Sequence, residues 1–214
     1  MDRPPHVALA EDEANCGAAS SPIILSDEEM NLSLAAAKMV LGQLSSRDLV
    51  DIAVKALLEG SDSPSLAVLA GETAPIWSDV GPLFERGLRE SGVAVPSKHE
   101  SIWTLLSHLL ALIASGEIDC YEGMGMIDHA IRRNLPDEFE DTRYVGDGLG
   151  MERCYTWYRE LQDAEDGSVL LYYSDLPRDE AIAKFRANLI EEARKALERI
   201  KNEQAAATNR SSAP

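Results

Sequence analysis

Apolar residues recur every three to four positions along most of the chain between residues 23 and 203, which is the spacing of amphipathic α-helices. Short segments with glycine, proline or polar residues interrupt the pattern at intervals. The pattern predicts an all-α fold, a single compact multi-helix domain of about eight helices. Residues 1–22 and 204–214 lack the period and are predicted to be disordered tails, the first of them acidic.

Capping signals predict where several helices begin. A serine or aspartate followed three residues later by glutamate occurs as Ser26 with Glu29, Ser97 with Glu100, and Asp119 with Glu122. A serine precedes a proline at residues 63–64, which is typical of a helix start. Glycines or prolines follow the apolar runs as stop signals. The predicted helices span about 26–42, 46–60, 63–71, 80–92, 97–115, 119–136, 151–163 and 177–203.

Two segments differ from the amphipathic pattern. The helix over 97–115 has apolar side chains on nearly every side, so we expect it to be the central buried helix. Residues 168–173 (Ser-Val-Leu-Leu-Tyr-Tyr) have the composition of a strand, but a lone strand would lack a partner. We therefore expect this segment to be a loop or an edge.

The charge is strongly acidic, with 37 Asp and Glu against 20 Lys and Arg, a net charge of −17 over 214 residues. This charge disfavours direct binding of nucleic acid or of an anionic membrane, and it favours a basic protein partner. The hydrophobic content of 45% is that of a globular protein. With no secretory signal visible and no apolar stretch long enough to span a bilayer, the chain is expected to be cytoplasmic.

The acidic residues concentrate in one part of the sequence. Between Ser115 and Glu152 lie ten acidic and three basic residues, whereas nine acidic and eight basic residues lie between Ala164 and Pro214. Six of the twelve aromatic residues fall within residues 144–173, beside the acidic span. Acids steer a basic partner, and tyrosine and tryptophan anchor interfaces. The predicted partner-binding residues are Asp137, Glu138, Glu140, Asp141, Tyr144, Trp157 and Tyr158.

The aromatic residues have a second interpretation, in which they pack the last helix onto the core while the acids face water. Tyr155 and Tyr158 are expected to share one face of their helix, with Trp157 on another face. Both interpretations remain open at the level of the sequence.

No catalytic or metal-binding pattern is complete, so no catalytic residue, metal or cofactor is predicted. The four histidines form no Glu-x-x-His or His-x-x-x-His motif, and the three cysteines form no Cys-x-x-Cys pair. Cys120 lies near a helix N-terminus, which could lower its thiol pKa, although packing between helices is the preferred interpretation. The glycine cluster at residues 145–150 lacks the lysine of a phosphate loop and is interpreted as a connector.

Several segments resemble a group of small uncharacterised bacterial helical proteins. The segments that carry the resemblance are Asp62-Ser63-Pro64-Ser65-Leu66, Leu69-Ala70-Gly71, Pro82-Leu83-Phe84, Gly116-Glu117-Ile118-Asp119, Tyr121-Glu122-Gly123 and Ile190-Glu191-Glu192-Ala193. It extends over roughly residues 45–200, and Cys120 stands where the group has proline. The resemblance implies a bacterial cytosolic helical domain and no catalytic residue.

Three functions are compatible with these observations. The preferred hypothesis is an acidic protein-interaction domain that binds a basic protein partner, for example an immunity protein or antitoxin against a cationic toxin. The first alternative is a DNA-mimic inhibitor of a nucleic-acid-binding enzyme, which requires a continuous acidic stripe. The second is an enzyme with a site assembled from distant residues around His108, His129 and nearby acids, which requires those side chains to cluster.

Overall fold

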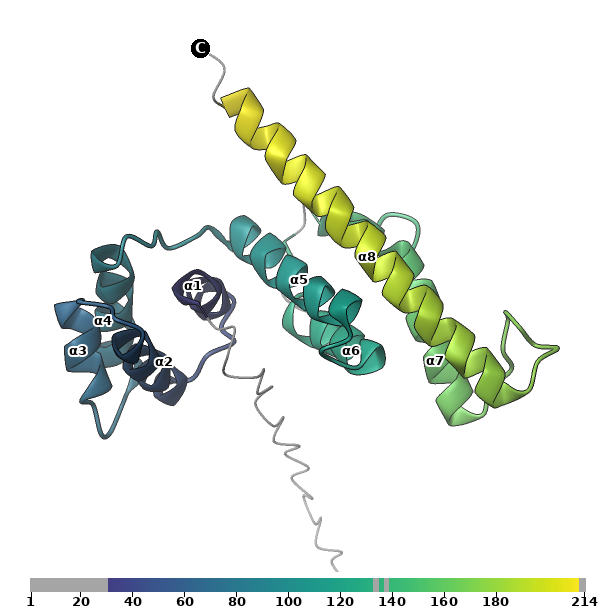
Figure 1. Ribbon diagram of the computed structural model, residues 1–214, viewed down its shortest axis with the longest axis horizontal. Helices are drawn as coiled ribbons and strands as arrows, with labels where there is room; N and C mark the ends of the chain where they lie inside the picture. The colour runs from purple at the N-terminus through teal and green to yellow at the C-terminus, as the bar shows by residue number, and fades with distance from the viewer. Residues whose placement is uncertain (1–30, 133–134, 137–138, 212–214) are drawn as a thin grey trace, which may run out of the picture.

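The computed structural model describes residues 31–132, 135–136 and 139–211, with side chains as far as residue 206. Within these ranges the chain forms eight α-helices and no β-strand, which confirms the all-α prediction (Figure 1). The helices are α1 (Leu32–Val40), α2 (Ser46–Leu58), α3 (Pro64–Ala70), α4 (Trp77–Glu90), α5 (Lys98–Ser115), α6 (Cys120–Ala130), α7 (Glu152–Asp166) and α8 (Arg178–Ser211). A short 3₁₀ helix, Asp147–Leu149, precedes α7.

The predicted caps begin three of these helices. The Ser63 side chain accepts from the backbone of α3, and Ser97 forms a complete capping box with Glu100 at the start of α5. Asp119 accepts from the Tyr121 and Glu122 backbone at the start of α6. These interactions satisfy backbone N–H groups that have no partner within the helix.

The predicted cap at Ser26 lies outside the described residues. Helix α1 starts at Leu32, and the side chain of its cap, Asn31, accepts from the Leu34 N–H at 2.8 Å. Asparagine offers the same acceptor as serine at this position, so the signal was present but nearer the apolar run.

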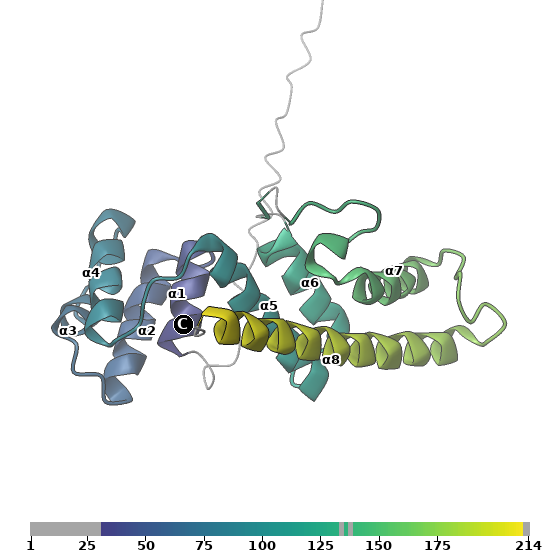
Figure 2. The same cartoon turned by 90° about the horizontal axis from the view of Figure 1, so that it is seen from above.

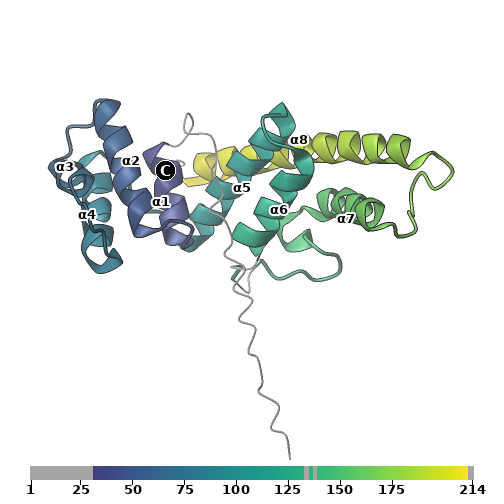
Figure 3. The same ribbon diagram turned by 90° about the horizontal axis from the view of Figure 1, so that it is seen from below.

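The first four helices pack around one apolar cluster. Its fully buried side chains include Leu49, Leu66, Leu69, Phe84 and Leu88. Helices α2, α3 and α4 contact one another in this half, and Figure 3 shows them gathered at one end of the molecule.

The last four helices pack around a second cluster, with α5 in contact with α1, α6 and α8. The predicted central helix is therefore confirmed, since α5 contributes Ile102, Leu106, Leu110 and other buried side chains. Figure 2 shows α7 running beside the first part of α8. Helix α1 joins the halves, because Leu34 belongs to this cluster while Ala35 and Ala36 belong to the other, so the molecule is one domain.

The ends of two helices, α6 and α8, differ most from the prediction. Helix α6 ends at Ala130, ahead of Pro136. Residues 168–173 form a loop, as expected. Helix α8 continues to Ser211, so residues 204–211 are helical rather than the predicted disordered tail, and its last turns project past the neighbouring helices (Figure 1). Alanine, glutamine and arginine in this stretch favour helix without any apolar period.

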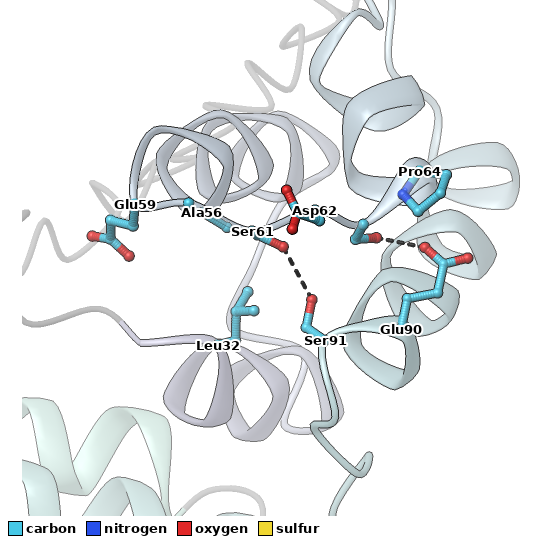
Figure 4. A pocket seen from close by; sticks show the side chains of 10 residues that line it. Leu32, Ala56, Glu59, Ser61, Asp62, Pro64, Glu90 and Ser91 are labelled. Carbon is cyan, nitrogen blue, oxygen red and sulfur yellow. Dashed lines mark hydrogen bonds between the residues drawn. The ribbon is translucent and has the colours of Figure 1, made fainter.

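One interface in the first half depends on a carboxylate at the end of α4. Glu90 Oε2 accepts from Ser63 Oγ at 2.5 Å and from the Ser65 N–H at 3.0 Å, and Glu90 Oε1 accepts from Ser65 Oγ at 2.8 Å. Figure 4 shows the Glu90 side chain among those that line the neighbouring pocket. The hydrogen bonds from Ser63 and then Ser65 lower the pKa of Glu90. Glu90 thus fastens α4 to the start of α3, beside an open pocket of about 420 Å³.

Ser63→Ala should lower the free energy of unfolding by about 1 to 2 kcal/mol, because the buried hydroxyl both caps α3 and donates to Glu90. Urea unfolding measures the change. Ser78→Ala is the control, since Ser78 is exposed and its hydroxyl donates to the neighbouring Asp79, and its effect should stay within about 0.5 kcal/mol. Equal effects of the two variants would contradict this role of Ser63.

The stability that Glu90 contributes should depend on pH. Its pKa in the folded protein is lowered, so its contribution is complete above the ordinary value of 4.5 and is lost as the pH falls through the lowered pKa. The difference in unfolding free energy between the wild type and Glu90→Gln should therefore shrink between neutral pH and pH values well below 4.5. A difference that grows on acidification would contradict the assignment.

In the described part of the chain, no helix combines the length and the apolar character needed to cross a membrane.

Candidate functional site

An open groove of about 580 Å³ lies where α6 ends and the chain continues toward α7. Its lining combines acidic and apolar side chains with one arginine, and the residues are Asp128, Arg132, Leu135, Pro136, Phe139, Glu140 and Asp141. The Phe139 ring is buried, with its centroid 4.9 Å from that of His99 and 5.6 Å from that of Trp103, both on α5. This aromatic contact fixes the start of the loop against α5.

Arg132 organises the acidic side chains of the groove. Its Nη1 donates to Asp128 Oδ1 at 3.2 Å, and its Nη2 lies 3.6 Å from Asp141 Oδ2. The guanidinium also sits 5.5 Å from the ring centroid of Tyr155, whose hydroxyl donates to Asp128 Oδ1 at 3.4 Å. One cation is therefore shared by two carboxylates, and the groove keeps an excess of negative charge.

Asp147 holds the loop beyond the groove in one conformation. Its carboxylate accepts from the backbone N–H groups of Thr142, Arg143 and Tyr144 at 2.8 to 3.0 Å, and from the Thr142 hydroxyl at 3.0 Å. The backbone N–H groups of Tyr144, Arg143 and Thr142 lower the pKa of Asp147 to about 2. Asp147, which lies within the glycine cluster, thus ties the cluster to residues 142–144 and keeps this turn in one conformation.

The predicted acidic residues are only partly described. Glu140 is exposed and Asp141 half-buried, and both line the groove, whereas Asp137 and Glu138 lie outside the described residues. Asp141 Oδ1 also accepts from the Gly148 N–H at 3.4 Å, so it has a structural task in the loop. Among the described residues Glu140 makes no ion pair, which leaves its charge available to a partner.

The predicted aromatic residues do not form one patch. Tyr144 is 56% exposed, with the Arg143 guanidinium 5.1 Å from its ring centroid. Tyr158 is half-buried beside Tyr121, at a centroid distance of 5.1 Å. It shares its helix face with Tyr155, as predicted, and the centroids of the two rings are 6.3 Å apart.

Trp157 lies on a different face of α7 and packs against α8. Its ring centroid is 6.2 Å from that of Phe185 and 5.1 Å from that of Tyr172. Both half-buried aromatics, Trp157 and Tyr158, pack against the core. The structure therefore gives Trp157 a packing role, in agreement with the interpretation that the aromatic residues pack the last helix onto the core. Tyr144 is the exposed aromatic residue nearest in sequence to the acidic residues 137–141.

The two described cysteines, Cys120 and Cys154, are both buried. Burial raises the pKa of the Cys120 thiol, so the lowering considered from its helix-terminal position does not occur. Burial also raises the pKa of Cys154 to about 12. His129 is exposed on α6, and His99 Nε2 accepts from Trp103 Nε1 at 3.1 Å. Across the described ranges no three His, Cys, Asp or Glu side chains gather as a metal site would require.

Sequence reasoning missed three charged residues of the groove and its loop. Asp128 and Arg132 form an i,i+4 pair, a spacing that could have identified them. Aspartate is common in turns, but the three backbone N–H groups that donate to Asp147 come together only in the folded loop. No protein-family model, curated protein or solved structure matches this chain, so the resemblance to small bacterial helical proteins stays a prediction.

Proposed function

We propose that this protein is a cytoplasmic protein-interaction domain that binds a basic protein partner at the groove between α6 and α7. The observation that carries the proposal is the charge of the groove, where Asp128, Glu140 and Asp141 face a single cation, Arg132. An immunity protein or antitoxin that neutralises a cationic toxin is its most concrete form.

The arrangement of the groove supports recognition rather than simple solubility. Asp128 and Asp141 are held by Arg132, and Asp147 fixes the following turn, so the acidic side chains need little ordering when a partner arrives. Leu135 and Phe139 add apolar side chains to the same lining. A basic side chain from a partner would place its charge near the carboxylates and its aliphatic stem against these apolar side chains.

The DNA-mimic alternative receives less support from the charges of α8. A mimic requires an acidic stripe that imitates phosphates, but exposed Arg194, Lys195 and Arg199 interrupt the acids along this helix. Lys195 pairs with Glu191 and Glu192, as expected for a solvated helix face.

Neutralising the acidic segment should slow association with the partner about tenfold at low salt and flatten its dependence on ionic strength. The variant carries Asp137→Asn, Glu138→Gln and Glu140→Gln, and it keeps Asp141 because that residue holds the loop. The partner is captured from native lysate with tagged wild-type protein, identified, purified and used in stopped-flow measurements. We expect it to be a basic protein.

The control variant carries Glu59→Gln, Asp62→Asn and Glu85→Gln in the first half of the molecule, which changes the net charge by the same amount. Its association rate should stay close to that of the wild type. Equal slowing by both variants would show that net charge alone, and not the groove, sets the association rate. An acidic partner, or binding that does not depend on salt, would overturn the proposal.

A further inference from the structure

The loop between α7 and α8, residues 167–177, exposes apolar side chains at one end of the molecule. Val169 is 84% exposed, Leu171 is 79% exposed and Tyr172 is 45% exposed, whereas Leu170 between them is buried. The loop protrudes where α7 turns back into α8 (Figure 1). Exposing two aliphatic side chains and a tyrosine to water is energetically unfavourable, and a need for solubility does not account for it.

A buried carboxylate on α7 holds the backbone of this loop in place. Glu160 on α7 is 2% exposed, and its Oε2 accepts from the backbone N–H groups of Leu171 at 3.1 Å and Tyr172 at 3.3 Å. Burying a carboxylate is unfavourable unless hydrogen bonds compensate it. Here the compensating donors are the backbone of the residues whose side chains are exposed, so Glu160 fixes their position.

The two ends of the loop are fastened as well. Arg178 donates to the Ala164 carbonyl at 2.6 Å and to the Ser168 carbonyl at 2.7 Å, which ties the start of α8 to the end of α7. Tyr173 adopts a φ of 52°, a left-handed conformation that non-glycine residues rarely take. Its ring packs 5.8 Å from Phe185, and its hydroxyl accepts from Asn188 Nδ2 at 3.2 Å.

The surroundings of the exposed side chains are acidic. Between Asp163 and Glu180 the chain has six acidic residues and one basic residue, Arg178, whose guanidinium is engaged by backbone carbonyls. Lys184 lies 5.4 Å from the centroid of the Tyr173 ring, and Arg159 is exposed on α7. An acidic rim disfavours insertion into an anionic membrane and favours a protein surface that carries Lys and Arg.

We propose that the loop over residues 167–177 is a preformed recognition element, which places Val169, Leu171 and Tyr172 in an apolar pocket of a protein whose pocket rim is basic. The inference rests on the proposed function in taking the partner to be a basic protein. It adds an apolar anchor at the end of α7 opposite the groove. Fixing the loop before binding reduces the entropy lost on association, as in other interfaces with rigid anchors.

Photocrosslinking identifies what the loop contacts. Leu171 is replaced by benzoylphenylalanine in the full-length protein, and a second protein carries the same group in place of Leu58, which is 83% exposed on α2. Irradiation in native lysate should join the first protein, and not the second, to a basic protein. A crosslink to a second copy of this chain, equal products from both positions, or no protein product would overturn the inference.

The purified crosslinked partner then separates the loop from the groove. Val169→Ser with Leu171→Ser should raise the Kd about tenfold or more through faster dissociation, with the salt dependence unchanged. Ser168→Ala with Ser174→Ala, on the same loop, should leave the Kd within about threefold. If a basic partner binds and the apolar variant binds as well as wild type, this inference fails while the proposed function stands. If the partner is not basic, both fail.

Glu160→Gln tests whether the loop is held in advance. We expect faster hydrogen exchange at the Leu171 and Tyr172 amides and a higher Kd, with α8 amides unchanged. Unchanged exchange at these two amides would overturn the role of Glu160. Binding of wild type to phosphatidylglycerol vesicles that the Val169→Ser, Leu171→Ser variant loses would instead assign the loop to a membrane and overturn the proposal.

Discussion

Gly148→Ala should lower the free energy of unfolding by about 2 to 3 kcal/mol and disorder the loop that follows the groove. A Cβ atom at this position would lie 2.1 Å from the Phe139 carbonyl oxygen, 2.6 Å from its carbon and 3.0 Å from the Glu140 oxygen. These are backbone atoms, and the contacts of the Phe139 ring with His99 and Trp103 prevent that backbone from moving aside. Urea unfolding followed by circular dichroism measures the loss.

The same substitution should weaken binding of the basic partner, because the Gly148 N–H holds Asp141 in the groove. Gly125→Ala is the matched control. Gly125 lies in α6 with only the Tyr158 hydroxyl nearby, at 3.6 Å, so alanine there should be neutral or stabilise by up to about 1 kcal/mol. If Gly148→Ala proves as stable as Gly125→Ala, the close approach of the two backbone segments is not part of the folded loop.

Phe185→Ala and Phe84→Ala should each lower the free energy of unfolding by about 3 to 5 kcal/mol, because both rings are fully buried. Phe185 lies in the cluster of α5–α8, beside Trp157 and Tyr173, and Phe84 lies in the cluster of α1–α4. For a chain of this size the melting temperature should fall by roughly 10 °C in each variant.

The pair also tests whether the two clusters unfold together. Helix α1 contributes Leu34 to one and Ala35 to the other, so we expect a single transition that both variants shift. Variants that keep one tryptophan, with the other two changed to phenylalanine, distinguish the halves by fluorescence, since Trp157 reports on α7 and α8 while Trp77 begins α4. A Phe84→Ala protein in which Trp77 changes at lower temperature than Trp157 would show two units.

Acidic and basic residues are separated along the last part of the chain, from the end of α7 to the end of α8. From the sequence, the stretch from Ala164 to Pro214 is nearly neutral on average, yet five of its nine acids lie between Glu165 and Glu180, and seven of its eight bases lie farther along α8. Averaging over the segment concealed this separation. The two proposed contact regions lie at opposite ends of α7, a helix of 15 residues that is about 22 Å long.

The sequence by itself determined the helices and the central position of α5. Caps such as Ser97 with Glu100, the stop at Gly116 and the apolar surface of α5 depend on residues within a few positions of one another, so their physics is readable locally. The end of α8 was misjudged because intrinsic helix propensity extended it past the last apolar position.

Only the tertiary structure decided the groove and the recognition loop. The contacts that form them join residues at least nine positions apart in the sequence. They are the ion pair of Arg132 with Asp141, the hydrogen bonds of Glu160 with Leu171 and Tyr172, and the packing of Trp157 on Phe185. Whether a tyrosine or an acid faces water or a neighbour depends on which helices meet. That choice is made by the packing of the whole core, which no local pattern contains.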